Sequence, residues 1–154
     1  MQRIEAVTGS LAHRSVLILG VAYRGNVRET AFTSAKLVQH ALLQRGAVVY
    51  ADDPLYSDEE LRALGYTPLP ACYKHEIHAI ILQADHQEYS AADFGEFTHC
   101  QVVFDGRRAL SRVAIESLGM HYLAVGDGGY QQSQFTAKTP TLTAAGDFQG
   151  RREL

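Results

Sequence analysis

The chain has 154 residues, about the length of one folded domain. Its composition, with 46% hydrophobic and 20% charged residues, is ordinary for a globular protein. With 14 Lys and Arg against 17 Asp and Glu, the net charge of −3 excludes a broadly basic surface for nucleic acid or anionic membrane. No apolar run approaches the roughly 20 residues of a membrane span, so we expect a cytoplasmic protein with no nucleic-acid and no membrane partner. Cys72 and Cys100 are too few for a disulfide framework, and we expect buried or half-buried thiols.

The first half of the chain alternates short apolar runs with segments of helical spacing. Residues 2–7 are helix-like, and SVLILG at 15–20 is typical of a strand buried on both faces. Residues 33–45 have apolar side chains at helical spacing and end before a glycine. AVVYA at 47–51 predicts a second strand, and residues 57–65 predict a helix with a serine cap and an acidic first turn.

The second half repeats this alternation. IHAIIL at 77–82 predicts a strand, and 89–97 a short helix. Residues 102–104 predict a strand, 111–118 a short helix and 121–125 a last strand. Strands that alternate with helices in this order indicate a parallel α/β sheet with right-handed crossovers. We therefore expect a three-layer, Rossmann-like parallel sheet of about five to six strands, flanked by helices.

The domain boundaries follow from changes in composition. Residues 1–9 are expected to be the end of a preceding interdomain helix or linker, and residues 10–126 the Rossmann-like domain. Residues 127–154 are rich in Gly, Gln, Ser and Thr with little periodicity, and are expected to be a mobile tail.

Ligands of an open parallel sheet bind at the carboxyl ends of its strands, near the point where strand order reverses. The loop after the first strand has Gly20 and Gly25 only, so it is neither a dinucleotide fingerprint nor a phosphate-binding loop. Arg24, Arg28 and the following helix N-terminus are candidates for a phosphate. The alternative is a solvated loop that carries two arginines.

A second pair of arginines, Arg107 and Arg108, comes just after another predicted strand. In the doubly wound strand order this loop can face Arg24, and converging guanidinium groups suit a diphosphate. Surface arginines in ordinary ion pairs are the alternative. Asp53 is interpreted as a turn residue before Pro54.

Other chemistry has little support in the sequence. His86 follows Asp85 at a strand end, and we interpret the two as a hydrogen-bonded structural pair. The seven histidines show no metal-ligand spacing, and no nucleophile has a visible activating partner. We expect no catalytic residue and no metal site in this chain.

Four segments together resemble a known family. They are VLILGVAYRGNVRETAFTSA at 16–35, ADDP at 51–54, IILQADHQEY at 80–89 and VVFDGRRAL at 102–110. The first resembles the opening of the C-terminal, UDP-binding domain of the UDP-glucose/GDP-mannose dehydrogenases, an apolar strand followed by G-x-A-[FY]-K-x-N-x-x-D-T-R-x-S. The resemblance covers roughly residues 10–126.

The resemblance implies a part of an NAD-dependent UDP-sugar 6-dehydrogenase, which oxidises the sugar C6 hydroxymethyl to a carboxylate. Its partners are then a UDP-sugar and two domains of the same parent protein, an N-terminal NAD-binding domain and a central helical domain with the catalytic cysteine. NAD is bound mainly by that other domain, with no cofactor held by this chain alone, and the chain alone is expected to be inactive.

Particular residues match the family pattern. Tyr23 falls at the aromatic position beside the nucleotide sugar, Arg24 at a lysine that contacts it, and Arg107 at the arginine of D-x-R, with Arg108 next to it as a further candidate. Thr30 keeps the threonine of Asp-Thr-Arg and is the candidate NAD contact. Ala31 replaces the arginine expected to reach NAD.

Two other readings stay open. One is a free-standing nucleotide-sensing or interaction module without catalysis, which the alanine at position 31 favours. The other is a stand-alone NAD-binding Rossmann protein, against which the missing glycine fingerprint argues. Neither the sugar nor the base is specified by the sequence, because the sugar is expected to be read mainly by the other domains.

Overall fold

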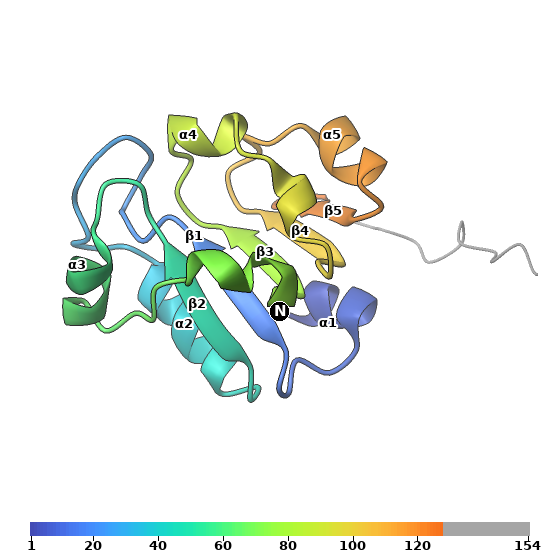
Figure 1. Cartoon of the computed structure of the whole chain (residues 1–154), viewed down its shortest axis with the longest axis horizontal. Helices are drawn as coiled ribbons and strands as arrows, with labels where there is room; N and C mark the ends of the chain where they lie inside the picture. The colour runs from blue at the N-terminus through green and yellow to red at the C-terminus, as the bar shows by residue number, and fades with distance from the viewer. Residues whose placement is uncertain (128–154) are drawn as a thin grey trace, which may run out of the picture.

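A computed structural model describes residues 1–127 and shows one parallel sheet (Figure 1). Its strand order is β2-β1-β3-β4-β5, and every neighbouring pair is parallel. The predicted fold class is therefore confirmed, with five strands in the described part of the chain. They are β1 Ser15–Leu19, β2 Val48–Asp52, β3 Ala79–Leu82, β4 Val102–Asp105 and β5 His121–Ala124.

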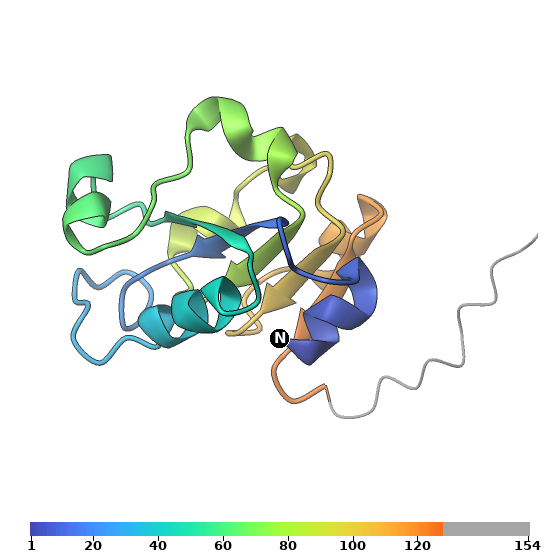
Figure 2. The ribbon, with the colours of Figure 1, turned by 90° about the horizontal axis from the view of Figure 1, so that it is seen from below.

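Helices cover both faces of the sheet. Figure 2 shows α1 and α2 on one face, with the 3₁₀ helix η1 on the other. The helices are α1 Gln2–Thr8, α2 Ala35–Leu43, α3 Asp58–Ala63, α4 Gln87–Ser90 and α5 Arg112–Ser117. Two 3₁₀ helices, η1 Ala71–Glu76 and η2 Phe94–Glu96, complete the elements. The helix predicted over 89–97 is thus two short pieces, and η1 was not predicted.

Successive side chains of β1 pack alternately into two hydrophobic clusters, one on each face of the sheet. Val16 and Ile18 of β1 pack into the cluster that contains Ile4 of α1 and Leu42 of α2. Leu17 and Leu19 pack into the opposite cluster with residues of α4, η2 and α5. Successive strand side chains point to opposite faces, so a continuous apolar run is what a sheet covered on both faces requires.

Two helix starts show why the predicted boundaries were close. α3 begins with a capping box, in which Ser57 Oγ accepts from Glu60 N (3.3 Å) and Glu60 Oε2 accepts from Ser57 N (2.9 Å). α2 begins two residues after the predicted Thr33. The Thr33 hydroxyl instead accepts from Ala35 N (3.2 Å) and donates to Ala22 O (3.2 Å), which ties the helix start to the loop after β1.

The N-terminal helix is packed on the sheet. α1 contacts β4 and β5, Arg3 Nη1 donates to Ala124 O at 2.7 Å, and Ile4 is 2% exposed. Whether residues 1–9 belong to an interdomain helix stays a prediction, and the tail predicted over 127–154 lies outside the described residues except for Asp127.

No described helix is long and apolar enough to cross a membrane. Cys100 is buried, but Cys72 is exposed, so the expectation of burial was wrong for Cys72.

Candidate functional site

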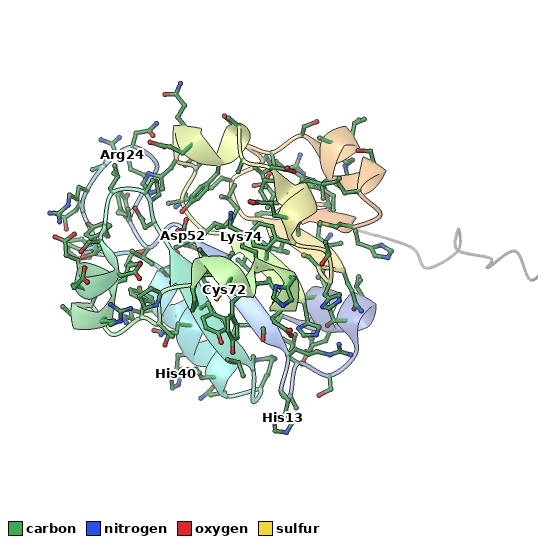
Figure 3. All side chains as sticks on the ribbon, viewed as in Figure 1. His13, Arg24, His40, Asp52, Cys72 and Lys74 are labelled. Atoms are coloured by element: carbon green, nitrogen blue, oxygen red, sulfur yellow. The ribbon has the colours of Figure 1, made fainter. Side chains whose placement is uncertain are left out.

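The loops that carry the predicted site residues lie at the carboxyl edge of the sheet. Figure 3 shows Arg24 on the loop after β1, at the opposite end of the sheet from His13, which precedes β1. β1 lies between β2 and β3, so strand order reverses at β1 and β3. This is the position at which open parallel sheets bind ligands.

Arg107 joins the loops after β1, β3 and β4. Its Nε donates to Gln83 O at 2.7 Å, and its Nη2 donates to Tyr23 O at 3.0 Å. Its own main-chain N–H donates to the buried carboxylate of Asp105 at 2.9 Å. The structure therefore brings Arg107 beside the Tyr23-Arg24 segment, as the strand order predicts. A guanidinium has five N–H donors, so three have no partner within residues 1–127 and are left for a ligand.

Asp105 holds the Arg107 loop in place. Its carboxylate also accepts from Leu110 N and from the Tyr122 hydroxyl, each at 2.8 Å. Burial, together with the bond to Asp105, raises the pKa of Tyr122 to about 12. The hydroxyl therefore stays protonated and remains a donor at neutral pH.

Tyr23 and Arg24 are open to a ligand. Tyr23 is 51% exposed, and Arg24 is exposed as well. Among residues 1–127, no hydrogen bond or ion pair engages the Arg24 guanidinium. A guanidinium that is exposed and without a partner in the described residues, on a loop that Arg107 also contacts, gives this edge of the sheet a positive charge suited to a phosphate.

Arg107 also lines a cavity of about 270 Å³. Its wall is partly apolar, with Ile81 and Phe104 from the strands and Val38 from α2, and Gln83 adds a polar group. A ligand held by Arg107 therefore has a partly apolar recess next to it.

The structure does not bring Arg108 to the same place. Its backbone has φ 56°, its Nε donates to Val125 O at 2.8 Å, and its Nη2 pairs with Asp127 at 2.7 Å. Asp127 also pairs with Arg112 at 2.7 Å. Arg108 is therefore engaged with the turn after β5, and Arg107 alone faces Tyr23.

Arg28 is likewise engaged elsewhere. It donates to Leu55 O at 3.0 Å, forms an ion pair with Glu60 of α3, and lies 4.8 Å from the centre of the Tyr56 ring. The pKa of Glu60 is lowered first by its bond to the Ser57 main chain and then by Arg28. Of the two arginines in this loop, only Arg24 is left for a ligand.

Thr30 lies farther along the loop, and the surroundings do not favour an anion. The Thr30 carbonyl accepts from Thr33 N at 3.3 Å. Glu29 Oε1 accepts from Ala31 N at 2.7 Å, so a carboxylate lies next to position 31, at which the family pattern has an arginine. The Thr30 carbonyl is therefore engaged within the loop, and its hydroxyl has no hydrogen-bond partner among the described residues.

The two glycines of the loop serve close packing between loops. A Cβ on Gly20 would lie 2.6 Å from Ala84 Cβ, and one on Gly25 would lie 2.1 Å from Asp85 O. In a dinucleotide fingerprint this space is where the pyrophosphate approaches the backbone. Here the loop after β3 fills the space next to Gly20 and Gly25. The described residues therefore do not form a dinucleotide-binding loop.

Two buried residues, Asp53 and His86, organise the site in a way the sequence did not reveal. Asp53 Oδ2 lies 3.1 Å from His86 Nε2, and neither side chain is exposed. The interpretation of His86 and Asp85 as a pair was therefore wrong, because Asp85 accepts from Gly25 N (3.3 Å) instead. Asp53 does keep a turn role, since its Oδ1 accepts from Leu55 N at 3.0 Å. The available signal in the sequence was an acidic residue directly after a predicted strand, at the edge where ligands bind.

The chain is similar to known proteins in sequence and in fold. The family described as "UDP-glucose/GDP-mannose dehydrogenase family, UDP binding domain" matches residues 17–112. A UDP-glucose 6-dehydrogenase of Drosophila melanogaster is 23% identical over 144 residues, which cover 80% of this chain and 30% of that protein.

Two solved structures share the fold. A UDP-glucose dehydrogenase from Pyrobaculum islandicum has a TM-score of 0.61 and 26% identity, over 73% of this chain and 26% of its own. A UDP-D-ManNAc dehydrogenase from Pyrococcus horikoshii has a TM-score of 0.60 and 18% identity, over 77% and 27%. The chain spans less than a third of the length of these relatives. The family match covers more than half of the chain, which therefore belongs to the UDP-binding domain of the UDP-glucose/GDP-mannose dehydrogenase family.

Proposed function

We propose that this chain binds the UDP part of a UDP-sugar within an NAD-dependent UDP-sugar 6-dehydrogenase. Oxidation of the sugar C6 hydroxymethyl to a carboxylate then requires an NAD-binding domain and a catalytic domain of the same parent protein. NAD, bound mainly by the first of these, supplies the hydride acceptor. This chain's contribution is to bind and orient the nucleotide, and a cytoplasmic location stays part of the proposal.

The observation that carries the proposal is the bond from Arg107 to the Tyr23 carbonyl, which brings Arg107 to the loop that carries Arg24. The two bonds to Gln83 O and Tyr23 O fix the Arg107 guanidinium plane before any ligand arrives. A fixed fork loses little freedom on binding and offers paired donors to phosphate oxygens. Arg24 adds a second positive charge, so the two together neutralise much of a diphosphate. Tyr23 offers an exposed ring to the nucleotide sugar.

Calorimetric titration of the chain with UDP tests this role, with GDP and NAD alongside. Arg24→Ala is the sharpest variant, because Arg24 has no partner to lose in the described part of the chain. A charge-assisted hydrogen bond contributes about 1.5–3 kcal/mol, so UDP affinity should fall about 10- to 100-fold. The melting temperature should stay unchanged.

Arg108→Ala is the matched control, since it removes the same charge from the same edge of the sheet while its contacts are with Val125 and Asp127. It should leave UDP affinity within about twofold, the scale on which exposed ion pairs matter. Wild-type chain that binds no UDP, or equal losses in both variants, would contradict the proposal.

A nucleotide-sensing module without catalysis is the second candidate. It is favoured by Ala31 and by the Glu29 carboxylate beside it, which together remove the cationic contact expected for NAD. An antibody raised against this chain separates the two candidates on a blot of the source cells. A band near 17.0 kDa supports the module. A band roughly three times larger supports the dehydrogenase, since the chain covers 30% of its curated relative.

A further inference from the structure

Asp53 and His86 form a buried bridge across the end of β1. Asp53 follows β2 and His86 follows β3, and these strands flank β1 on either side. The Asp53 Oδ2 to His86 Nε2 contact of 3.1 Å therefore passes over the point where β1 becomes the candidate nucleotide loop.

The bridge contacts that loop at two places. Asp53 Oδ2 accepts from the main-chain N–H groups of Val21 (2.8 Å) and Ala22 (3.1 Å). His86 Nδ1 accepts from the main-chain N–H of Asn26 at 3.1 Å. The main chain is thus held immediately before and immediately after the three residues 23–25.

These contacts define the protonation of the ring. A main-chain N–H only donates, so His86 Nδ1 carries a lone pair and the ring proton lies on Nε2, from which it is donated to Asp53. A neutral imidazole with this tautomer offers one acceptor and one donor in fixed positions. Asparagine can imitate only the acceptor at Nδ1, and glutamine only the donor at Nε2.

Within the loop, Tyr23 N donates to Glu29 O at 2.7 Å. The side-chain hydrogen bonds that residues 23–26 make outside the bridge are exposed and so hold the loop less firmly, as in the bond from Arg107 Nη2 to Tyr23 O. Gly25 N donates to Asp85 Oδ1 at 3.3 Å, and Asn26 Oδ1 accepts from Gln87 N at 3.0 Å. Exposed hydrogen bonds compete with water, whereas a fully buried acceptor gains little by leaving its donor.

We propose that Asp53 and His86 are positioning residues for Arg24. By fixing the main chain on both sides of residues 23–25, the bridge presents the Arg24 guanidinium to a diphosphate in an ordered loop. The inference rests on the proposed UDP-binding function and adds how that site is ordered in advance. Without the bridge at Asn26, ordering of the loop is deferred to the binding step and weakens binding.

The test compares His86→Gln with His86→Asn in the full chain. Hydrogen exchange at the Asn26 amide and UDP affinity by calorimetry are measured on each. We expect His86→Gln, which loses the acceptor for Asn26 N–H, to expose that amide and to lower UDP affinity about tenfold or more. We expect His86→Asn to keep the amide protected and to bind UDP within about threefold of wild type.

Ile77→Ala is the stability control, because Ile77 is fully buried and lies just before β3, at the other end of the sheet. Its melting temperature should fall at least as far as that of His86→Gln while its UDP affinity stays at the wild-type value. A merely structural role for His86 would instead make affinity follow melting temperature in all variants.

Two results would overturn the inference while leaving the proposed function intact. One is wild-type UDP affinity in His86→Gln with an exposed Asn26 amide, and the other is equal loss of affinity in Ile77→Ala. Wild-type chain that does not bind UDP contradicts the proposed function itself, and this is known before any variant is made. If His86→Gln fails to fold, tenfold weaker UDP binding by His86→Asn with a protected Asn26 amide refutes the inference by itself.

Discussion

Replacing Gly25 by alanine tests the close packing between the loops after β1 and β3. The added Cβ would lie 2.1 Å from Asp85 O and 2.5 Å from Asp85 C, and these main-chain atoms cannot rotate away. The loop must shift, which also breaks the bond from Gly25 N to Asp85 Oδ1. Overpacking of this kind costs about 1–3 kcal/mol and the lost hydrogen bond about 1 kcal/mol. The free energy of unfolding should therefore fall by about 2–4 kcal/mol, measured by urea denaturation.

Gly119→Ala supplies the comparison. No atom lies within 4 Å of a Cβ there, so the substitution adds only the strain of φ +82°, roughly 1–2 kcal/mol. UDP affinity separates the two variants further, since only Gly25→Ala displaces Arg24 and should weaken binding. If Gly25→Ala is no less stable than Gly119→Ala and binds UDP equally well, the close approach of the two loops is not rigid and the reasoning fails.

Two further predictions concern buried tyrosines. The Tyr66 hydroxyl is buried and has no hydrogen-bond partner among residues 1–127, so Tyr66→Phe should raise the free energy of unfolding by about 1 kcal/mol in urea denaturation. A loss of stability would show that the hydroxyl does have a partner. Burial raises the pKa of Tyr66 and of Tyr122 to about 12. Burial also raises the pKa of Tyr89. The unfolded chain therefore releases the tyrosine hydroxyl protons at lower pH than the folded chain does. The contribution of these tyrosines to the free energy of unfolding is complete below pH 10 and is lost between pH 10 and about 12. The loss should shrink in the Tyr66→Phe, Tyr122→Phe double variant, and an unchanged loss would show that other groups cause it.

Much of the fold follows from local patterns in the sequence. The apolar runs of β1, β3, β4 and β5 are buried on both faces of the sheet, whereas β2 alternates buried and exposed residues. Ser57 with Glu60 marks the start of α3 by chemistry that is local to four residues. The segment 89–97 failed as one helix because the Asp93 side chain accepts from Gly95 N and starts a separate turn. η1 has no buried residue, so it leaves no periodic pattern to find.

The candidate site was predictable only where strand order decides it. That Arg107 lies near Tyr23 follows from the doubly wound order, in which the loops after β1, β3 and β4 share one edge. The bond between Asp53 and His86 joins residues 33 apart that sit on either side of a third strand. Arg108 was grouped with its neighbour Arg107, but a left-handed backbone at φ 56° turns it toward Asp127. No sequence pattern specifies that conformation for an arginine.

The strand order also shapes how the chain reaches its native state. β3, β4 and β5 follow one another along the chain and in the sheet, so they can pair through short crossovers. β1 must instead find β3 across a long intervening segment, as in the pairing of Val16 with Ala79. Closing longer loops costs more entropy and slows folding. We therefore expect pairing of β1 with β3 to be the slow step, during which the open edge of β3 is the surface most exposed to aggregation.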